Sequence, residues 1–533
     1  MEQHRGIVVA KRGLVAASQP LAAAAGLRML MDGGSFADAA IATSAVLCVT
    51  EPHASHLGGD AFLIVYEAAT GKTYAFNGSG KAPQAATAER FGPAIPTRGV
   101  LSVAVPGLVD VWHKLHQRWG RLPLAKALEP AISYAEQGYP VGFRTARVFR
   151  DSQALWQEFP DTLQALTGQD RPPQVGQTIR QPALAKTLAL IADSGREAFY
   201  EGKLAEAIAR FCRQRGGLLS YEDLANHRTW VGEPIRTSYR GHTVHGQPPV
   251  SQGLLLLEEL NLVEGFDLAQ MGPLSADAIH VMVEAKKLAF ADRARFLGDP
   301  DFVSVSVEKL LDKSYAARRR EEIRMERASF PQSYSETAHD TTYFCVMDGD
   351  GNAVSFIQSV FWGYGSGVVV ENTGILLNNR LSGFSLDPKS PNFLQPGKKP
   401  LHTLNAWLIT RQTAGGEDVA YVGGTPGADW QVQTSLQVIC NLLDFGMNPQ
   451  QALEAPRWAH GPSVAGNGPA NLLQIESRVD TAVIETLRRR GHEVAPIGPW
   501  AHGSACQLIA RDAQTEALLG ASDPRCDGEA VGF

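Results

Sequence analysis

The sequence predicts a layered α/β (α+β) protein in which two sets of strands are covered by helices. From Leu108 to about Met325, apolar residues recur at spacings of three and four, which indicates amphipathic helices. Beyond Asp340 the sequence changes to short runs of β-branched and aromatic residues, which indicate strands. No run rich in glycine and serine, in proline or in like charges separates the two parts. We therefore expect one interwoven unit as readily as several domains.

Composition and charge limit the classes of protein to which the chain can belong. Its 533 residues, 44% of them hydrophobic, can bury a large core. There are 49 basic and 55 acidic residues, which gives a net charge of −6. The basic triplets Arg318–Arg320 and Arg488–Arg490 have acidic or polar neighbours, and we interpret them as solvated helix faces. The sequence therefore predicts no nucleic-acid partner.

The sequence also indicates a location in the cell. The first residues lack the apolar core and small-residue cleavage site of a signal peptide. No stretch reaches the roughly eighteen apolar residues that a membrane-spanning helix needs. We therefore expect a cytoplasmic protein without membrane contact. The six cysteines are scattered without a CxxC spacing, and we expect them to be buried, reduced thiols.

Two helices are expected near the beginning of the chain. Ser18 can cap the first helix, and Pro20 in its first turn costs no hydrogen bond. Ser35 and Asp38 form a capping-box-like start for the second, the apolar run 39–49, which we expect to be buried on most sides. The remaining elements are strands at 61–66, 72–76, 239–245, 342–347, 353–360, 368–370, 406–410, 418–423 and 506–511, and a helix at 431–443.

The stretch Thr341–Phe356 is predicted to form a tight hairpin. Its turn is Asp348–Gly351, in which we expect the glycines to supply positive φ angles. If the chain is cut between Asp340 and Thr341, the threonine carries both a nucleophilic hydroxyl and its own base, the free α-amine. Such an amine titrates at about 7.7–8.0, so part of it is free near neutral pH. Taken alone, a Thr-Thr pair at a strand start favours a structural role.

Further segments accompany the hairpin in a fixed order: Gly34–Ala40, Glu51–Gly59, Leu101–Gly107, Asp223–Asn226, Gly374–Asn379, Gly424–Gly427 and Gly520–Arg525. With these segments the chain closely resembles, nearly end to end, the γ-glutamyltransferase (γ-glutamyl transpeptidase) superfamily of self-cleaving N-terminal-nucleophile hydrolases. The resemblance implies a four-layer αββα sandwich. It also implies a cut at Asp340–Thr341, which would give a helix-rich large subunit 1–340 and a strand-rich small subunit 341–533.

The same resemblance implies how the fragments associate and what they bind. They are expected to stay together as a heterodimer, with further dimerisation left open. No cofactor is expected. His53 and His56 lie near Asp60 in a glycine-rich turn that the superfamily carries without a metal, so no metal site is expected either.

Three catalytic groups besides Thr341 follow from the resemblance. In transpeptidases a second hydroxyl residue, eighteen positions after the nucleophile, hydrogen-bonds it, and Ser359 occupies that position. Family members bind the oxyanion with consecutive backbone amides of a Pro-Gly-Gly turn, which here correspond to Gly427 and Ala428. The alanine keeps the amide but restricts φ, which affects the expected geometry of the loop. Without the resemblance, Ser359 could equally be an ordinary strand residue.

The sequence departs from the transpeptidase pattern in the pocket that holds the amino-acid end of a γ-glutamyl group. The arginine that binds the α-carboxylate is missing, because this chain reads Ser79–Pro83 at that place. Phe361 replaces an asparagine, and Arg380 and Gly383 replace a glutamine and an aspartate. The serine pair of transpeptidases corresponds to His402 and Thr403, and the segment 385–399 is shorter than their usual lid.

These departures favour a short substrate with a carboxylate and no α-amine. Arg380 suits a bidentate carboxylate, and Phe361 with Trp362 should shrink and dry the pocket. The pattern is most similar to the oxamate amidohydrolases of the superfamily, which release ammonia and oxalate. Three alternatives remain: a γ-glutamyltransferase or glutathione hydrolase, a cephalosporin- or glutaryl-type acylase, and a catalytically silent binding protein. The acceptor of the acyl group, water or an amine, is left open.

Overall fold

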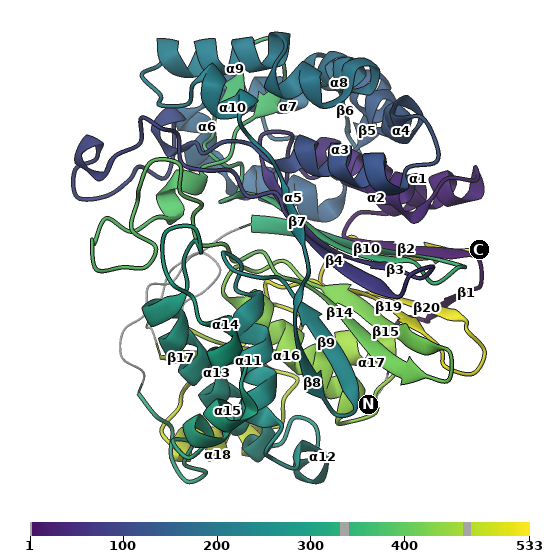
Figure 1. Ribbon diagram of the computed structural model, residues 1–533, viewed down its shortest axis with the longest axis vertical. Coiled ribbons are helices and arrows are strands. Elements are labelled where there is room, and N and C mark those ends of the chain that lie inside the picture. Colours follow the sequence, from purple (N-terminus) through teal and green to yellow (C-terminus); the bar gives the residue numbers. More distant parts are fainter. Residues whose placement is uncertain (1–2, 331–339, 462–468, 470) are drawn as a thin grey trace.

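The computed structural model describes residues 3–330, 340–461, 469 and 471–533. Two seven-stranded sheets are stacked at the centre of the molecule, and a layer of helices covers the outer face of each (Figure 1). The prediction of a four-layer αββα arrangement is confirmed. Because each sheet must bury both faces, such a stack provides one core between the sheets and one beneath each helical layer.

The first sheet contains the predicted hairpin at its centre. Its neighbouring strands are antiparallel, and the strand that begins at Asp340 lies between strands from both ends of the chain. In spatial order the strands are β21 (Glu529–Gly532), β2 (Gly13–Ala17), β10 (Asp340–Asp348), β11 (Ala353–Phe361), β3 (Asp60–Glu67), β4 (Lys72–Asn77) and β7 (Trp230–Gly232).

The second sheet also combines strands from before and after Asp340. Its order is β1 (Val8–Ala10), β20 (Leu518–Ser522), β19 (Gln507–Arg511), β15 (Gly416–Gly424), β14 (Ala406–Thr413), β9 (His242–Gly246) and β8 (Ile235–Tyr239). Smaller sheets pair β5 (Tyr139–Pro140) with β6 (Thr178–Ile179), β12 (Val369–Val370) with β13 (Ile375–Leu376), and β17 (Leu472–Glu476) with β16 (Trp458–His460) and β18 (Glu493–Ile497).

One helical layer covers each sheet (Figure 1). Above the first sheet lie α1 (Pro20–Met31), α2 (Phe36–Thr50), α3 (Leu108–Trp119), α4 (Leu124–Gln137), α5 (Phe143–Asp151), α6 (Gln153–Glu158), α7 (Pro160–Thr167), α8 (Pro182–Tyr200), α9 (Lys203–Gln214) and α10 (Tyr221–Ala225). Below the second lie α11 (Gly253–Val263), α12 (Leu268–Met271), α13 (Ala276–Phe296), α14 (Val307–Leu310), α15 (Lys313–Arg320), α16 (Trp430–Leu443), α17 (Pro449–Glu454) and α18 (Thr481–Arg489).

Strand alternation divides the residues of β10 between two cores. Phe344 and Val346 face the core that contains α2. Tyr343, Cys345 and Met347 face the core between the two sheets. This follows from the two-residue period of a strand, and both faces are apolar because both are covered.

Several sequence predictions for single elements are confirmed. The capping box of Ser35 and Asp38 is present at the start of α2, and the whole helix is buried. All six cysteines are buried and free. In the described part of the chain, no helix combines the length and the apolar character that crossing a membrane would require.

Other predictions for single elements were wrong. Ser18 does not cap α1, because the side chain of Gln19 accepts the hydrogen bond from the amide of Ala22. The expected strand 239–245 is a hairpin of β8 and β9, since Arg240 and Gly241 both adopt positive φ and turn the chain. In the turn of the main hairpin, only Gly351 of the two glycines has positive φ.

The basic triplets are only partly solvated. The guanidinium of Arg320 donates to the carbonyl oxygens of Asn261 and Leu262. That of Arg490 donates to the carbonyl of Ala276. These side chains therefore tie helices to neighbouring segments, which the linear charge pattern did not reveal.

Candidate active site

Thr341 lies near the start of β10, at the point where the hairpin strands reach one end of the sheet. Its side chain is buried, and Oγ1 lies 3.3 Å from Oγ of Ser359, which lies near the end of β11. The same Ser359 oxygen accepts the backbone N–H of Phe361 at 2.8 Å. The register between Asp340 and Thr342 is irregular, and Asp340 pairs with Phe361. The two strands therefore bring the predicted nucleophile and its predicted hydroxyl partner together.

Thr342 faces the opposite side of the sheet, as strand alternation requires. Its Oγ1 donates to Oε2 of Glu51 at 2.7 Å, and Ser18 Oγ donates to the same oxygen at 2.7 Å. The two hydroxyl oxygens are 2.5 Å apart. This buried group holds the start of β10 against the end of α2, one residue from Thr341. The sequence did not reveal it, because Ser18 and Thr342 are 324 residues apart.

The predicted oxyanion turn follows β15. Gly427 and Ala428 both adopt positive φ, of 124° and 52°. Within the described residues neither backbone amide has a hydrogen-bond acceptor, whereas the carbonyl of Ala428 accepts Nε2 of Gln252 at 2.9 Å. An alanine in the left-handed region is strained, and such strain is common where a backbone must present its amides to a ligand.

The residues that follow this turn are held by a buried ion pair. Both guanidinium Nη atoms of Arg293 on α13 approach the carboxylate of Asp429, at 2.6 Å and 3.1 Å. Arg293 also donates to Gln252, whose amide reaches the carbonyls of Thr403 and Ala428. This network joins the turn to α13 and to the segment that contains Thr403. Bidentate pairing fixes orientation as well as position, so the turn is rigidly supported.

Close packing places the turn beside β10. A Cβ added at Gly424 would lie 2.4 Å from the ring of Tyr343, so only glycine allows this approach. Tyr343 also hydrogen-bonds Ser355, whose hydroxyl donates to the carbonyl of Gly423. Residues two apart on a strand share a face, so Thr341 faces the same side of β10 as Tyr343. Thr341 and the 423–429 turn therefore lie on the same side of the first sheet.

The side chain of Arg380 is fully buried and, within the described residues, forms an ion pair with Asp60. Its Nε donates to Oδ2 of Asp60 at 2.8 Å, and the other carboxylate oxygen accepts the amide of Gly80 at 3.3 Å. The guanidinium carbon lies 4.3 Å from the centre of the Phe361 ring. Both Nη atoms are buried without a hydrogen-bond partner among the described residues. The described part of the protein therefore leaves the hydrogen-bonding capacity of both Nη atoms unused.

Asp60 connects Arg380 with the hydroxyl pair. In the sheet Asp60 pairs with Ser359, so the carboxylate that holds Arg380 lies on the strand beside the predicted partner of the nucleophile. Burial lowers the pKa of Arg380 and is opposed by Asp60, and burial raises the pKa of Asp60 and is opposed by Arg380. Each charge is therefore retained chiefly because the other lies against it.

His402 and Thr403 lie in the same region but make structural contacts. Nε2 of His402 lies 2.6 Å from Oγ of Ser79, and the centroid of its ring lies 4.8 Å from that of Phe62. The carbonyl of Thr403 accepts Gln252, and its hydroxyl is buried.

Sequence reasoning missed Asp60 and Gln252 as members of this site. The sequence feature that could have indicated Asp60 is an acidic residue at the start of a largely apolar strand. His56, which was considered with it, has another partner: its Nδ1 accepts the amide of Leu376 at 3.2 Å. The Asp60 carboxylate instead serves Arg380 and Gly80.

The fold and the threonine site together define the class of protein. Residues 22–533 match the family described as Gamma-glutamyltranspeptidase, and the chain belongs to that family of N-terminal-nucleophile hydrolases. It is therefore an enzyme of the hydrolase and acylase type.

Individual relatives carry different substrate names. The chain is 38% identical over 529 residues to a glutathione hydrolase-like proenzyme, YwrD, of Bacillus subtilis, with 99% of each chain covered. It is 34% identical over 535 residues to an oxamate amidohydrolase proenzyme of Klebsiella pneumoniae, with 98% of this chain and 99% of the relative covered. Its structure is similar to that of a cephalosporin acylase from Bacillus halodurans, with a TM-score of 0.93, 40% identity, and coverage of 100% and 98%.

Proposed function

We propose that the chain is a proenzyme that cuts itself between Asp340 and Thr341 and then acts as an N-terminal threonine amidohydrolase. Relatives that align over almost the whole chain are named proenzymes. Cleavage would give fragments 1–340 and 341–533. Both sheets combine strands from the two fragments, so we expect them to remain together as a heterodimer.

The chemistry we propose uses Ser359, which lies beside Thr341, and the 423–429 turn on the same side of the first sheet. The free α-amine of Thr341 takes the hydroxyl proton, and Oγ1 attacks the amide carbonyl of the substrate. Ser359 orients the hydroxyl, while the amides of Gly427 and Ala428 bind the oxyanion. The protonated amine then gives its proton to the leaving nitrogen, which departs as ammonia. Water hydrolyses the resulting ester and releases a carboxylic acid. The hydroxyls of Thr341 and Ser359 lie 3.3 Å apart in the ligand-free chain, within the range seen for catalytic hydrogen bonds before substrate binds.

We propose a short amide that carries a carboxylate as the substrate, and oxamate as the first candidate. The observation that carries this proposal is the pair of buried Nη atoms of Arg380 beside Phe361, which have no hydrogen-bond partner within the described ranges. Two parallel N–H donors match the two oxygens of a carboxylate. Oxamate would place its carboxylate at Arg380 and its amide carbonyl at Thr341, and hydrolysis would yield oxalate and ammonia. His402 and Thr403 would line the remainder of the pocket.

Two other substrate classes have specific support. Relatives of similar identity are named glutathione hydrolase-like protein and cephalosporin acylase, so a γ-glutamyl compound or an acylated amine is the alternative. A γ-glutamyl group carries an α-ammonium as well as a carboxylate. The Asp60 carboxylate beside Arg380 already accepts Arg380 and Gly80, which disfavours it as an ammonium partner.

An ammonia-release panel tests the proposal. Intact-mass analysis first establishes whether the purified chain is cut before Thr341. The protein is then assayed with oxamate, succinamate, glutamine, a γ-glutamyl anilide and a glutaryl amide. We expect oxamate to have the largest kcat/KM. Efficient γ-glutamyl turnover, stimulated by dipeptide acceptors and without activity on oxamate, would contradict the substrate assignment but leave the threonine mechanism standing.

A further inference from the structure

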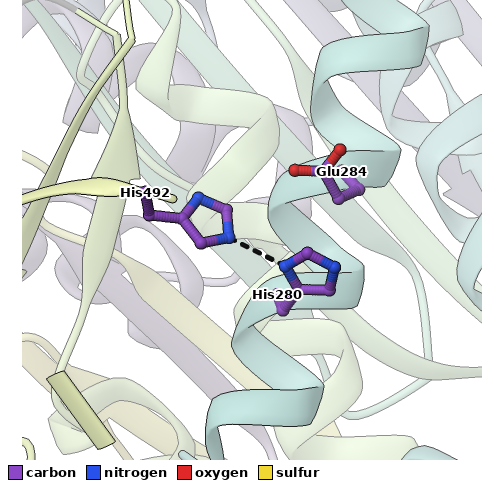
Figure 2. A group of neighbouring side chains, drawn as sticks. All are labelled: His280, Glu284 and His492. Atoms are coloured by element: carbon purple, nitrogen blue, oxygen red, sulfur yellow. Dashed lines mark hydrogen bonds between the residues drawn. The ribbon is translucent and has the colours of Figure 1, made fainter. Parts of the chain in front are cut away.

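Two histidines and a glutamate form a buried cluster in the helical layer below the second sheet. His280 and Glu284 lie one turn apart on α13, and His492 lies immediately before β18 (Figure 2). One ligand atom from each of these side chains lies within 4.8 Å of the others. All three are buried. The candidate active site uses none of them.

Hydrogen bonds fix the orientation of the two rings. Nε2 of His280 lies 2.9 Å from the carbonyl oxygen of Arg324, which can only accept, so this nitrogen carries the proton. The Nδ1 lone pair of His280 therefore points at Nε2 of His492, 2.8 Å away (Figure 2). In the ion-free arrangement, His492 Nε2 must donate.

The carboxylate of Glu284 is also oriented before any ion binds. Its Oε2 accepts the amide and hydroxyl of Ser329, at 3.0 Å and 2.5 Å, and its Oε1 accepts Nζ of Lys287 at 2.7 Å. The Oε1 atom keeps a second lone pair for a further partner. These contacts come from outside the cluster and orient two of the three ligand groups, His280 and Glu284, as outer-shell contacts do in metal sites.

We propose that His280, Glu284 and His492 form a site for a divalent ion of the zinc type. Imidazole and carboxylate ligands suit this class, and a water molecule would complete a tetrahedron. With metal–nitrogen distances of about 2.0–2.1 Å, the two nitrogens would lie about 3.3 Å apart, so the rings must separate by about half an ångström and turn until both lone pairs meet at the ion. The Glu284 carboxylate, now within 4.8 Å of the ring nitrogens, must move closer as well. His492 would bind through Nε2 after its proton has moved to Nδ1.

Such an ion would join parts of the chain on either side of the proposed cut. His280 and Glu284 precede Asp340, whereas His492 follows it, 212 residues from His280. The ion would therefore link the two fragments, a consequence that rests on the proposed cleavage. The site itself does not, because its ligands are assembled in the uncut chain.

The positive charge of Lys287 lies beside the proposed site and provides an electrostatic test of it. Its ammonium lies against Glu284 and is held by the carbonyl of Ser329 at 2.8 Å. A cation bound to Glu284 is repelled by this ammonium, so the native site should bind metal less tightly than a neutral variant. Lys287→Met removes the charge and keeps an apolar side chain of similar length. We expect it to raise metal affinity at least tenfold.

Cobalt provides the test, because tetrahedral Co²⁺ absorbs visible light and replaces zinc. Full-length protein and its Thr341→Ala variant are titrated with Co²⁺, then with Zn²⁺, and dialysed samples are analysed for metal by mass spectrometry. We expect one tetrahedral ion per chain in both proteins. His280→Ala should abolish binding, whereas His116→Ala, which changes a histidine on α3 that contacts the carbonyl of Leu122, should not.

A conservative variant distinguishes loss of metal binding from failure of the protein to fold. In His492→Gln the amide nitrogen can still donate to Nδ1 of His280, but the ring lone pair is lost, so we expect a folded protein without the cobalt band. The proposal is overturned if the native chain takes up no ion. It is also overturned if binding survives in His492→Gln, or if Lys287→Met binds no more tightly. Metal binding by uncut Thr341→Ala supports the site even if the native chain proves not to cut itself.

Discussion

Arg380 and Asp60 form an ion pair in which neither side chain has exposed surface, with Nε and Oδ2 2.8 Å apart. The pair leaves both Nη atoms without a partner among the described residues. Removing one member of a buried pair typically costs about 3–5 kcal/mol, because the other charge is left uncompensated. Tests of the substrate pocket should therefore keep a positive charge at position 380.

Arg380→Lys keeps the charge but loses the planar pair of donors. A charge-assisted hydrogen bond contributes about 1.5–3 kcal/mol, so kcat/KM for oxamate should fall at least about tenfold. Acetamide has no carboxylate, so its turnover should change much less. Self-cleavage uses no substrate carboxylate and should proceed normally. An equal loss for both amides would indicate a general distortion of the site rather than carboxylate recognition.

Thr341→Ala should remain one uncut chain of 533 residues. The reason is that cleavage and turnover both require the hydroxyl of Thr341 as nucleophile. Intact-mass analysis and denaturing electrophoresis provide the measurement. Thr342→Ala is the matched control, because it removes the adjacent hydroxyl that binds Glu51 and should still yield two fragments. Two fragments from Thr341→Ala would mean that the nucleophile has been misassigned.

Ala428→Gly should relieve the strained backbone of the 423–429 turn. The φ of 52° destabilises the folded state by roughly 1–2 kcal/mol when the residue is alanine. A glycine removes this strain, but its greater freedom in the unfolded chain lowers the free energy of unfolding by about 0.4–1 kcal/mol. We expect a net stabilisation between zero and about 1.6 kcal/mol in denaturant unfolding, with self-cleavage retained. The Ala428→Val variant should be less stable and should cleave itself more slowly, since β-branched residues tolerate a positive φ poorly. Clear destabilisation by glycine would show that the alanine methyl group makes contacts that matter more than φ.

Lowering the pH below neutrality should destabilise the fold through His56. Burial lowers its pKa from 6.5 to about 3, and its Nδ1 must be unprotonated to accept the amide of Leu376. Between these values the unfolded chain binds the extra proton. The contribution of His56 is therefore complete above about pH 6.5 and is lost progressively as the pH falls, by up to about 1.4 kcal/mol per pH unit.

The corresponding variant is His56→Asn, whose side-chain oxygen can accept the same amide without titrating. Denaturant unfolding from about pH 5 to about pH 7 should show a slope shallower by up to about 1.4 kcal/mol per pH unit than that of the native chain. Identical slopes would show that His56 is not the group responsible. His53, whose pKa burial lowers to about 4, contributes with the same sign and stays unchanged in the comparison.

Local pattern was sufficient for the hairpin and for α2. Runs with β-branched and aromatic residues on both sides of a glycine-containing turn predicted β10 and β11, and the capping box of Ser35 and Asp38 predicted the start of α2. Prediction failed where a tertiary contact competed with a local one. Ser18 is a good capping residue, yet its hydroxyl binds Glu51 and Thr342, so Gln19 caps α1 instead.

The sequence by itself determined the fold class and the family, and it predicts Thr341 as the nucleophile. These depend on periodicity, turn chemistry and ordered motifs, all of which are properties of neighbouring residues. Only the tertiary structure decided which distant side chains meet. Asp60 and Arg380 are 320 residues apart, and His280 and His492 are 212 residues apart. Such pairs are set by sheet register and helix packing, which act in space and leave no regular spacing along the chain.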